Sequence, residues 1–168
     1  MRHDMQTLAQ GLVEHDLVLP SGVKGVWGRG TAFEDIVQRF NDFVTRETKE
    51  DGAQELQFPP VLPRELIEKL GYLDNFPQLA GSIHSFFGKD ADAREIARKA
   101  REGEDWEAML QPTEVMLTPA ACYPVYPNFS GLLPGNGRLI TVTGWVFRHE
   151  PSDEPTRRLA GGLEVADR

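Results

Sequence analysis

Apolar residues recur at the spacing of one helix face in the first third of the chain, at Phe33, Ile36, Val37, Phe40, Phe43 and Val44. Thr31 is followed three residues later by Glu34, which is the pattern of a capping box at a helix start. We therefore predict a helix over residues 32–47. Before it, the stretch GVKGVWGRG at 22–30 favours a glycine-rich turn over a phosphate-binding loop, because no Lys-Ser/Thr pair follows it.

Prolines and glycines mark the limits of the next elements. A short strand over 56–58 should end at Pro59, because proline cannot donate to a sheet ladder. Pro63 suits the first turn of a second helix over 64–70, which Gly71 would end in a left-handed conformation. The following stretch NFPQLAGSIHSFFG mixes these breakers with large apolar residues, which favours a buried irregular segment.

The second half alternates one polar helix with strand patterns. The polar, alanine-rich stretch 92–110 predicts a helix with Gly103 as a break, lying on the outside or offering a face to a partner. Residues 114–117 and a β-branched run ending at Phe147 predict strands. The turn signal at 135–137 predicts two antiparallel strands around a loop. The pattern as a whole predicts an α+β fold with a mainly antiparallel sheet.

Composition narrows the class of protein. At 168 residues with 40% hydrophobic and 26% charged residues, the chain is typical of one globular domain. The net charge of −8 argues against a general nucleic-acid-binding surface, although it allows a local basic site. Cys122 is the single cysteine, the opening residues lack the apolar core of a signal peptide, and no stretch is long enough to cross a membrane. We expect a cytoplasmic protein without a membrane partner.

The stretch WVFRHEPSDEPTRR at 145–158 is the first candidate for chemistry. In an extended chain Arg148 and Glu150 share one side while His149 points to the other. The pair is either an ordinary surface ion pair, contributing at most about 1 kcal/mol, or a phosphate-binding Arg steadied by a carboxylate. Spacing alone favours the surface pair. A lone cysteine in an apolar stretch, such as Cys122, is likewise typical of a small core residue.

Four segments taken together change this interpretation. FRHEPSDEPTR resembles motif 2 of the class II aminoacyl-tRNA synthetases, and ELQFPPVLPRELIEKLGY resembles their motif 1. With NFPQLAGSIHSFFG and LTPAACYPVYP, they resemble the amino acid:carrier-protein ligases, small homologues of the atypical archaeal-type seryl-tRNA synthetase. The resemblance implies the N-terminal part of a class II catalytic domain over 22–157, an antiparallel sheet flanked by helices. Residues 1–21 are then an N-terminal extension, and 158–168 a divergent tail.

The resemblance also implies a function and its residues. The family activates a small amino acid with ATP and magnesium, then passes it to the phosphopantetheine thiol of an acyl carrier protein, without tRNA. Arg148 matches the motif 2 Arg that holds the α-phosphate, where it would stabilise charge in the transition state. Glu150 matches the Glu at the nucleotide, Arg157 lies in the matching loop, and Cys122 matches the first zinc ligand. The intact family is expected to form homodimers, and the helix at 92–110 matches the region that receives the carrier protein.

The sequence departs from the family at the zinc site. The family binds zinc with a Cys, a Glu and a second Cys, whereas this sequence has one Cys, and Val165 stands at the expected Glu position with Glu164 beside it. Motif 3, with a second ATP-binding Arg, has no counterpart. We therefore expect an incomplete zinc site, and a catalytic domain cut off after motif 2 by a truncation or frameshift, or else one piece of a split protein, whose adenylation is defective. The alternative is a non-catalytic remnant or binding module that keeps a dimer or carrier-protein surface.

Overall fold

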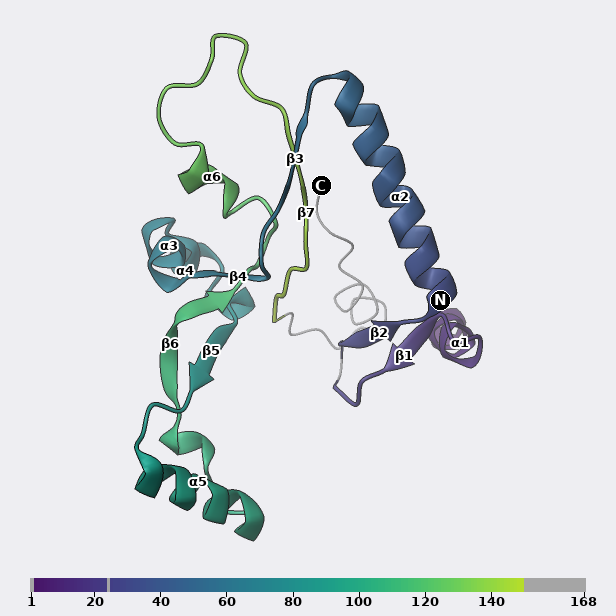
Figure 1. The fold of residues 1–168 in the computed structure, drawn as a ribbon. Helices are drawn as coiled ribbons and strands as arrows, with labels where there is room; N and C mark the ends of the chain where they lie inside the picture. The colour runs from purple at the N-terminus through teal and green to yellow at the C-terminus, as the bar shows by residue number, and fades with distance from the viewer. Residues whose placement is uncertain (1, 24, 150–168) are drawn as a thin grey trace.

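The computed structural model describes residues 2–23 and 25–149 (Figure 1). Its elements, in chain order, are α1 (Arg2–Glu14), β1 (Val18–Pro20), β2 (Trp27–Arg29), α2 (Thr31–Glu50), β3 (Gln54–Gln57), β4 (Val61–Pro63), α3 (Arg64–Lys69), α4 (Tyr72–Asn75), the 3-10 turn η1 (Pro77–Leu79), β5 (Ser82–Ser85), α5 (Asp90–Glu102), the 3-10 turn η2 (Glu107–Met109), β6 (Gln111–Leu117), α6 (Val125–Asn128) and β7 (Ile140–Thr143). This mixture of helices and mainly antiparallel strand pairs is the predicted α+β class.

The N-terminal part is a strand hairpin that leads into the longest helix. β1 pairs antiparallel with β2, and Gly22 and Gly25 adopt left-handed φ angles of 82° and 83° in the connection, which confirms the predicted glycine-rich turn. The predicted helix is confirmed as α2, which continues to Glu50. The predicted capping box is wrong. Gly30 is the N-cap without any side-chain bond to the helix, and the Glu34 carboxylate instead lies 3.3 Å from Arg29.

β3 and β7 form a parallel pair in the middle of the fold (Figure 1), with Leu56 opposite Val142. The predicted antiparallel pair around residues 135–137 is therefore wrong, although the turn itself forms, with Gly137 at φ 75° and its N–H donating to the Pro134 carbonyl. The predicted strand also ends early, at Thr143. Beyond Thr143 the chain leaves the ladder, and the N–H of Phe147 donates to the Thr118 carbonyl at 2.8 Å.

β4, β6 and β5 form a three-stranded antiparallel sheet in that order. Its first core, termed core 1, consists of Leu62, Ile67, Tyr72 and Met116. The predicted second helix is confirmed as α3, and Gly71 follows it at φ 63°. The expectation of an irregular buried segment over 75–88 is wrong in part, because β5 forms there, pairs with β6, and leaves Phe87 62% exposed.

α5 projects from the end of the β5–β6 pair, away from the other elements (Figure 1). The predicted break at Gly103 is confirmed, because Gly103 caps the helix in a left-handed conformation at φ 71°, and the predicted continuation to residue 110 is wrong. Neither α5 nor any other helix within the described part of the chain combines the length and apolar character needed to cross a membrane.

Candidate functional site

A second buried cluster, termed core 2, joins the segment after β6 to the segment after β7. It consists of Ala121, Val125, Val142 and Val146. Ala121 and Val125 flank Cys122, whereas Val142 and Val146 precede Arg148 in the chain. Burial of these four side chains therefore brings the two segments that carry predicted site residues against one another.

Arg148 lies on a segment that main-chain hydrogen bonds hold in place. The N–H of Phe147 donates to the Thr118 carbonyl at 2.8 Å, and the N–H of His149 donates to the Leu79 carbonyl at 3.2 Å. The Arg148 side chain between them is exposed. An arginine on a fixed backbone at the surface is suited to bind a phosphate. The other two predicted nucleotide-binding residues, Glu150 and Arg157, lie outside the described residues.

Tyr123 is a residue whose pKa is affected by both Cys122 and Arg148. Burial raises the pKa of the Tyr123 hydroxyl, the Cys122 thiol raises it further, and the positive charge of Arg148 opposes the rise. The Tyr123 ring packs against core 1 and makes an edge-on contact with Tyr72 at 5.7 Å between ring centroids. Tyr123 thus packs against core 1, within electrostatic reach of Cys122 and Arg148.

Cys122 is an exposed free thiol beside a second tyrosine, Tyr126. A hydrogen bond with the Cys122 side chain raises the pKa of the Tyr126 hydroxyl, with smaller effects from charge repulsion and burial. The general expectation that a lone cysteine is a core residue does not hold here. Cys122 instead faces solvent on the same segment as Tyr123.

Thr118 is a candidate that sequence reasoning missed. Its side chain is 2% exposed, and its hydroxyl has no hydrogen-bond partner, which is costly for a buried polar group. Its main-chain carbonyl accepts from the N–H of Phe147 and its N–H donates to the Pro60 carbonyl, so it links the segment of Arg148 to the chain before Cys122. The available signal was a threonine directly before the Pro-Ala-Ala-Cys stretch.

The residues around Cys122 do not fit a zinc ion by themselves. Within residues 2–23 and 25–149, no group of three or more His, Cys, Asp or Glu side chains is placed to hold a metal. A catalytic zinc site takes three protein ligands and leaves one open position. Cys122 supplies one such ligand.

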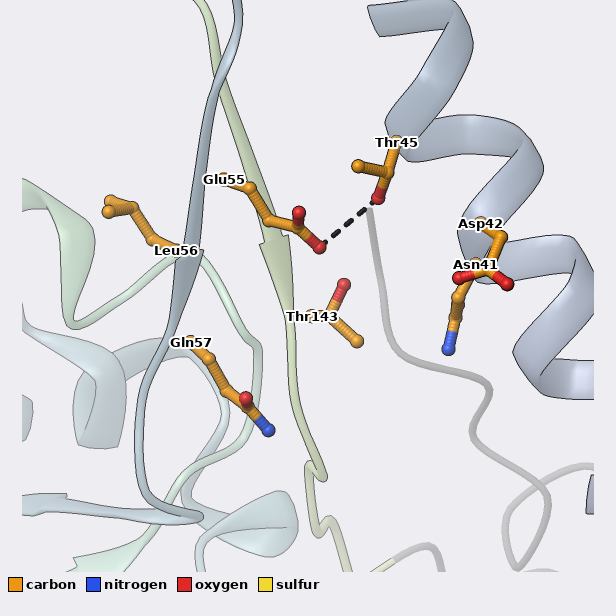
Figure 2. A pocket seen from close by; sticks show the side chains of 7 residues that line it. All are labelled: Asn41, Asp42, Thr45, Glu55, Leu56, Gln57 and Thr143. Carbon is orange, nitrogen blue, oxygen red and sulfur yellow. Dashed lines mark hydrogen bonds between the residues drawn. The ribbon is translucent and has the colours of Figure 1, made fainter. Parts of the chain in front are cut away.

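A polar pocket of about 390 Å³ lies between α2 and the β3–β7 pair (Figure 2). Asn41, Asp42, Thr45, Glu55, Leu56, Gln57 and Thr143 line it. The Thr45 hydroxyl donates to the Glu55 carboxylate at 3.1 Å across it. In Figure 2 Glu55 and Leu56 point to opposite sides of β3, and Leu56 pairs with the core 2 residue Val142. The pocket therefore lies on the opposite face of the ladder from core 2 and the Cys122 segment.

Two curated relatives match 133 residues of the chain. They are amino acid–acyl-carrier-protein ligases 1 and 2 of Bradyrhizobium diazoefficiens, at 39% and 36% identity. Each match covers 78% of this chain and 40% of the relative, so the chain spans about two fifths of the length of these ligases. No protein-family model matches the chain.

A solved structure shows the same fold. It is described as A. aeolicus tRNASec in complex with M. kandleri SerRS, and it matches with a TM-score of 0.71 at 20% identity. The match covers 92% of this chain and 31% of the other. The fold is therefore that of part of a class II aminoacyl-tRNA synthetase, as predicted. The chain is a homologue of the amino acid–acyl-carrier-protein ligases over the matched part of their length, which confirms the family resemblance expected from its sequence.

Proposed function

We propose that this chain supplies the ATP-binding and amino-acid-binding part of an ATP-dependent amino acid:carrier-protein ligase. In that reaction a carboxylate oxygen of a small amino acid attacks the α-phosphorus of ATP, and pyrophosphate leaves with magnesium as its counter-ion. The phosphopantetheine thiol of an acyl carrier protein then attacks the activated carbonyl, and AMP leaves. The observation that carries the proposal is the 36–39% identity to two such ligases.

Arg148 is the residue proposed to hold the α-phosphate. Arg148 lies at the surface, and the hydrogen bonds of its two neighbours hold its backbone. A backbone held in this way limits where the guanidinium can lie, which favours electrostatic stabilisation of a transition state. Glu150 and Arg157, outside the described residues, are proposed to bind the same nucleotide.

The test of this proposal is ATP binding by the purified chain, measured by calorimetry with magnesium present. Arg148→Ala should weaken binding by about 10- to 100-fold, the range expected for losing a hydrogen bond to a charged group. Arg39→Ala is the matched control, because Arg39 is exposed on α2 and pairs with Asp35 at 2.9 Å. A wild-type chain that binds no ATP would contradict the proposal. Amino-acid-dependent exchange of pyrophosphate into ATP then decides whether the chain also catalyses adenylation.

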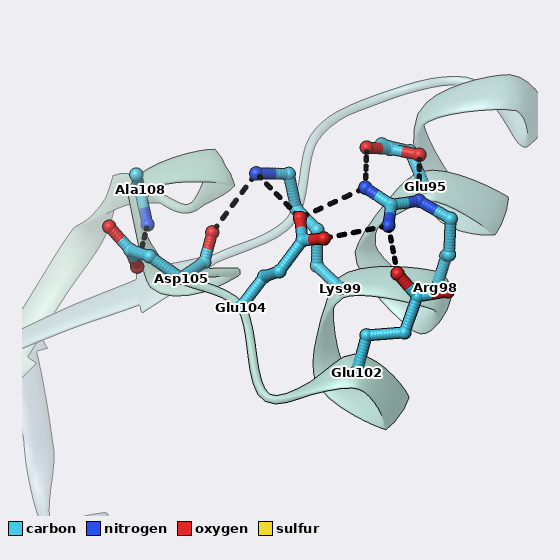
Figure 3. Close-up of polar contacts among 7 residues, drawn as sticks. All are labelled: Glu95, Arg98, Lys99, Glu102, Glu104, Asp105 and Ala108. Carbon is cyan, nitrogen blue, oxygen red and sulfur yellow. Dashed lines mark hydrogen bonds and ion pairs between the residues drawn. The ribbon is translucent and has the colours of Figure 1, made fainter.

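α5 is the proposed contact surface for the carrier protein. Arg98 on this helix is neutralised by Glu95, Glu102 and Glu104 (Figure 3). Arg94 and Arg101 lie seven residues apart on one exposed face, and neither forms an ion pair with a described residue. Two basic side chains on a projecting helix suit an acidic partner, because opposite charges steer association. Arg94→Glu with Arg101→Glu should abolish capture of a carrier protein, whereas unchanged capture would exclude this surface.

A second candidate function is a binding module that dimerises through α2. None of the α2 residues is buried, and Ile36, Phe40 and Phe43 are 62%, 50% and 49% exposed on one flank. An apolar stripe of this kind is typical of an interface. Sedimentation should then show a wild-type dimer and a monomer for Phe40→Glu. A monomeric wild type would exclude this function.

A further inference from the structure

Arg29 connects the N-terminal hairpin to the segment that carries Arg148. Its guanidinium carbon lies 4.1 Å from the centroid of the Trp145 ring, close enough for a cation–π contact. We propose that Arg29 is a positioning residue for Arg148, acting through Trp145; the inference rests on the proposed function of Arg148 in ATP binding.

The surroundings of Arg29 select one side-chain arrangement. Its side chain is 12% exposed, its Nη1 lies 3.3 Å from the Glu34 carboxylate, and the Phe33 ring centroid lies 5.9 Å from its guanidinium carbon. A charge so far removed from water needs compensation from its neighbours. Glu34 supplies the opposite charge and the Trp145 ring supplies a π face. Contact with the Trp145 ring therefore offsets part of the cost of burying the positive charge of Arg29.

The backbone of Arg29 is itself a fixed point. Arg29 pairs with Val18, which is fully buried, in the β1–β2 hairpin. The next residue, Gly30, donates its N–H to the Leu17 carbonyl at 2.9 Å and is the N-cap of α2. The hairpin and the start of α2 thus fix the backbone of Arg29 on both sides, so the position of its Cα is fixed.

Different interactions restrain different residues of the segment 145–149, which Arg29 contacts. Val146 is buried in core 2, and the N–H groups of Phe147 and His149 are hydrogen-bonded to Thr118 and Leu79. Trp145, by contrast, is 47% exposed, and its described ring contact is with Arg29. Arg29 therefore restrains Trp145 at the start of the segment, while core 2 restrains Val146. Loss of the Arg29 contact should let Trp145 move and weaken the hydrogen bond at Phe147.

The test compares Arg29→Ala and Arg29→Lys with the control Arg39→Ala by hydrogen exchange of single amides in the full chain. Arg29→Ala should speed exchange at Phe147 and His149 by about tenfold, the size expected for losing a cation–π contact and an ion pair. Exchange at Leu117, whose N–H donates to Gly81 in the β5–β6 region, should stay unchanged. Lysine keeps the charge but loses the planar stacking on the indole ring, so its effect should be intermediate.

The same variants are then titrated with magnesium ATP and followed by tryptophan fluorescence. Arg29→Ala should raise the Kd for ATP by about tenfold. If the wild type binds no ATP, the proposed function fails, yet amide exchange still decides whether Arg29 orders the segment. Unchanged exchange at Phe147 in both Arg29 variants would overturn the inference. Faster exchange at Leu117 as well would assign Arg29 to general stability and would also overturn it.

Discussion

Leu56 of β3 and Val142 of β7 lie opposite each other in a parallel ladder, although most of the middle of the chain separates them in sequence. A parallel pair needs a long crossover connection. Here the crossover contains the β4-β6-β5 sheet, α5 and the segment with Cys122. Because Val142 belongs to core 2 with Ala121 and Val125, the return of the crossover places that segment against the ladder.

Core 1 should carry much of the stability of the three-stranded sheet. Leu62 is 2% exposed there, so Leu62→Ala should lower the free energy of unfolding by about 2–5 kcal/mol, through lost burial and the cavity left behind. Leu132 is fully exposed, and Leu132→Ala should change stability by less than about 0.5 kcal/mol. Urea unfolding of both variants provides the comparison. Equal effects would show that core 1 is not packed as described.

Gly30 should tolerate no side chain. A Cβ at this position would lie 1.6 Å from the Asp16 carbonyl oxygen, and a backbone atom cannot rotate out of the way. Gly30→Ala should therefore destabilise the chain by about 1–3 kcal/mol or more. Gly11→Ala is the control, because a Cβ at Gly11 meets nothing within 4 Å and alanine favours the helix. Thermal unfolding should separate the two variants. A Gly30→Ala chain as stable as the wild type would refute the close approach.

Removal of the Cys122 thiol should change the titration of Tyr126. The hydrogen bond with Cys122 is the largest cause that raises the pKa of Tyr126 above its ordinary value of 10.0. In Cys122→Ala the pKa should fall toward that value, so tyrosinate should appear at lower pH than in the wild type. Ultraviolet absorption titration measures this change, and Tyr126→Phe assigns the signal. An identical titration curve in Cys122→Ala would show that the two side chains do not interact.

The carboxylates around Arg98 should titrate at low pH. The hydrogen bond with Arg98 is the largest cause that lowers the pKa of both Glu95 and Glu104 below 4.5. Because the folded pKa values are depressed, the stabilisation is present above the ordinary value and is lost as pH falls through the folded values. Arg98→Ala should raise both pKa values toward 4.5, as measured by NMR of the carboxyl carbons. Since these groups are on the surface, the change in global stability should be small.

Local signals in the sequence predicted the elements that depend on local physics. The apolar spacing from Phe33 to Val44 gave α2, and Gly71 and Gly103 adopt the left-handed conformations expected after helices. The turn at 135–137 also formed, but its flanking strands did not pair with each other. A turn constrains four residues, whereas a strand's partner depends on which distant surface it buries. The capping box failed because α2 has Gly30 as its N-cap, which places Thr31 inside the helix, and Glu34 pairs with Arg29.

In the candidate site, too, the sequence identifies some features and only the tertiary structure decides others. The sequence by itself determined the identity of Cys122 and Arg148 as candidates, because the motifs that identify them are short and contiguous. Tertiary structure alone decided that core 2 brings their segments together around Tyr123, that the Thr118 hydroxyl is buried without a partner, and that Arg29 contacts Trp145. These relationships arise when apolar side chains from distant segments leave water together. Linear spacing does not encode them, since the partner of each residue is fixed only once the cores are packed.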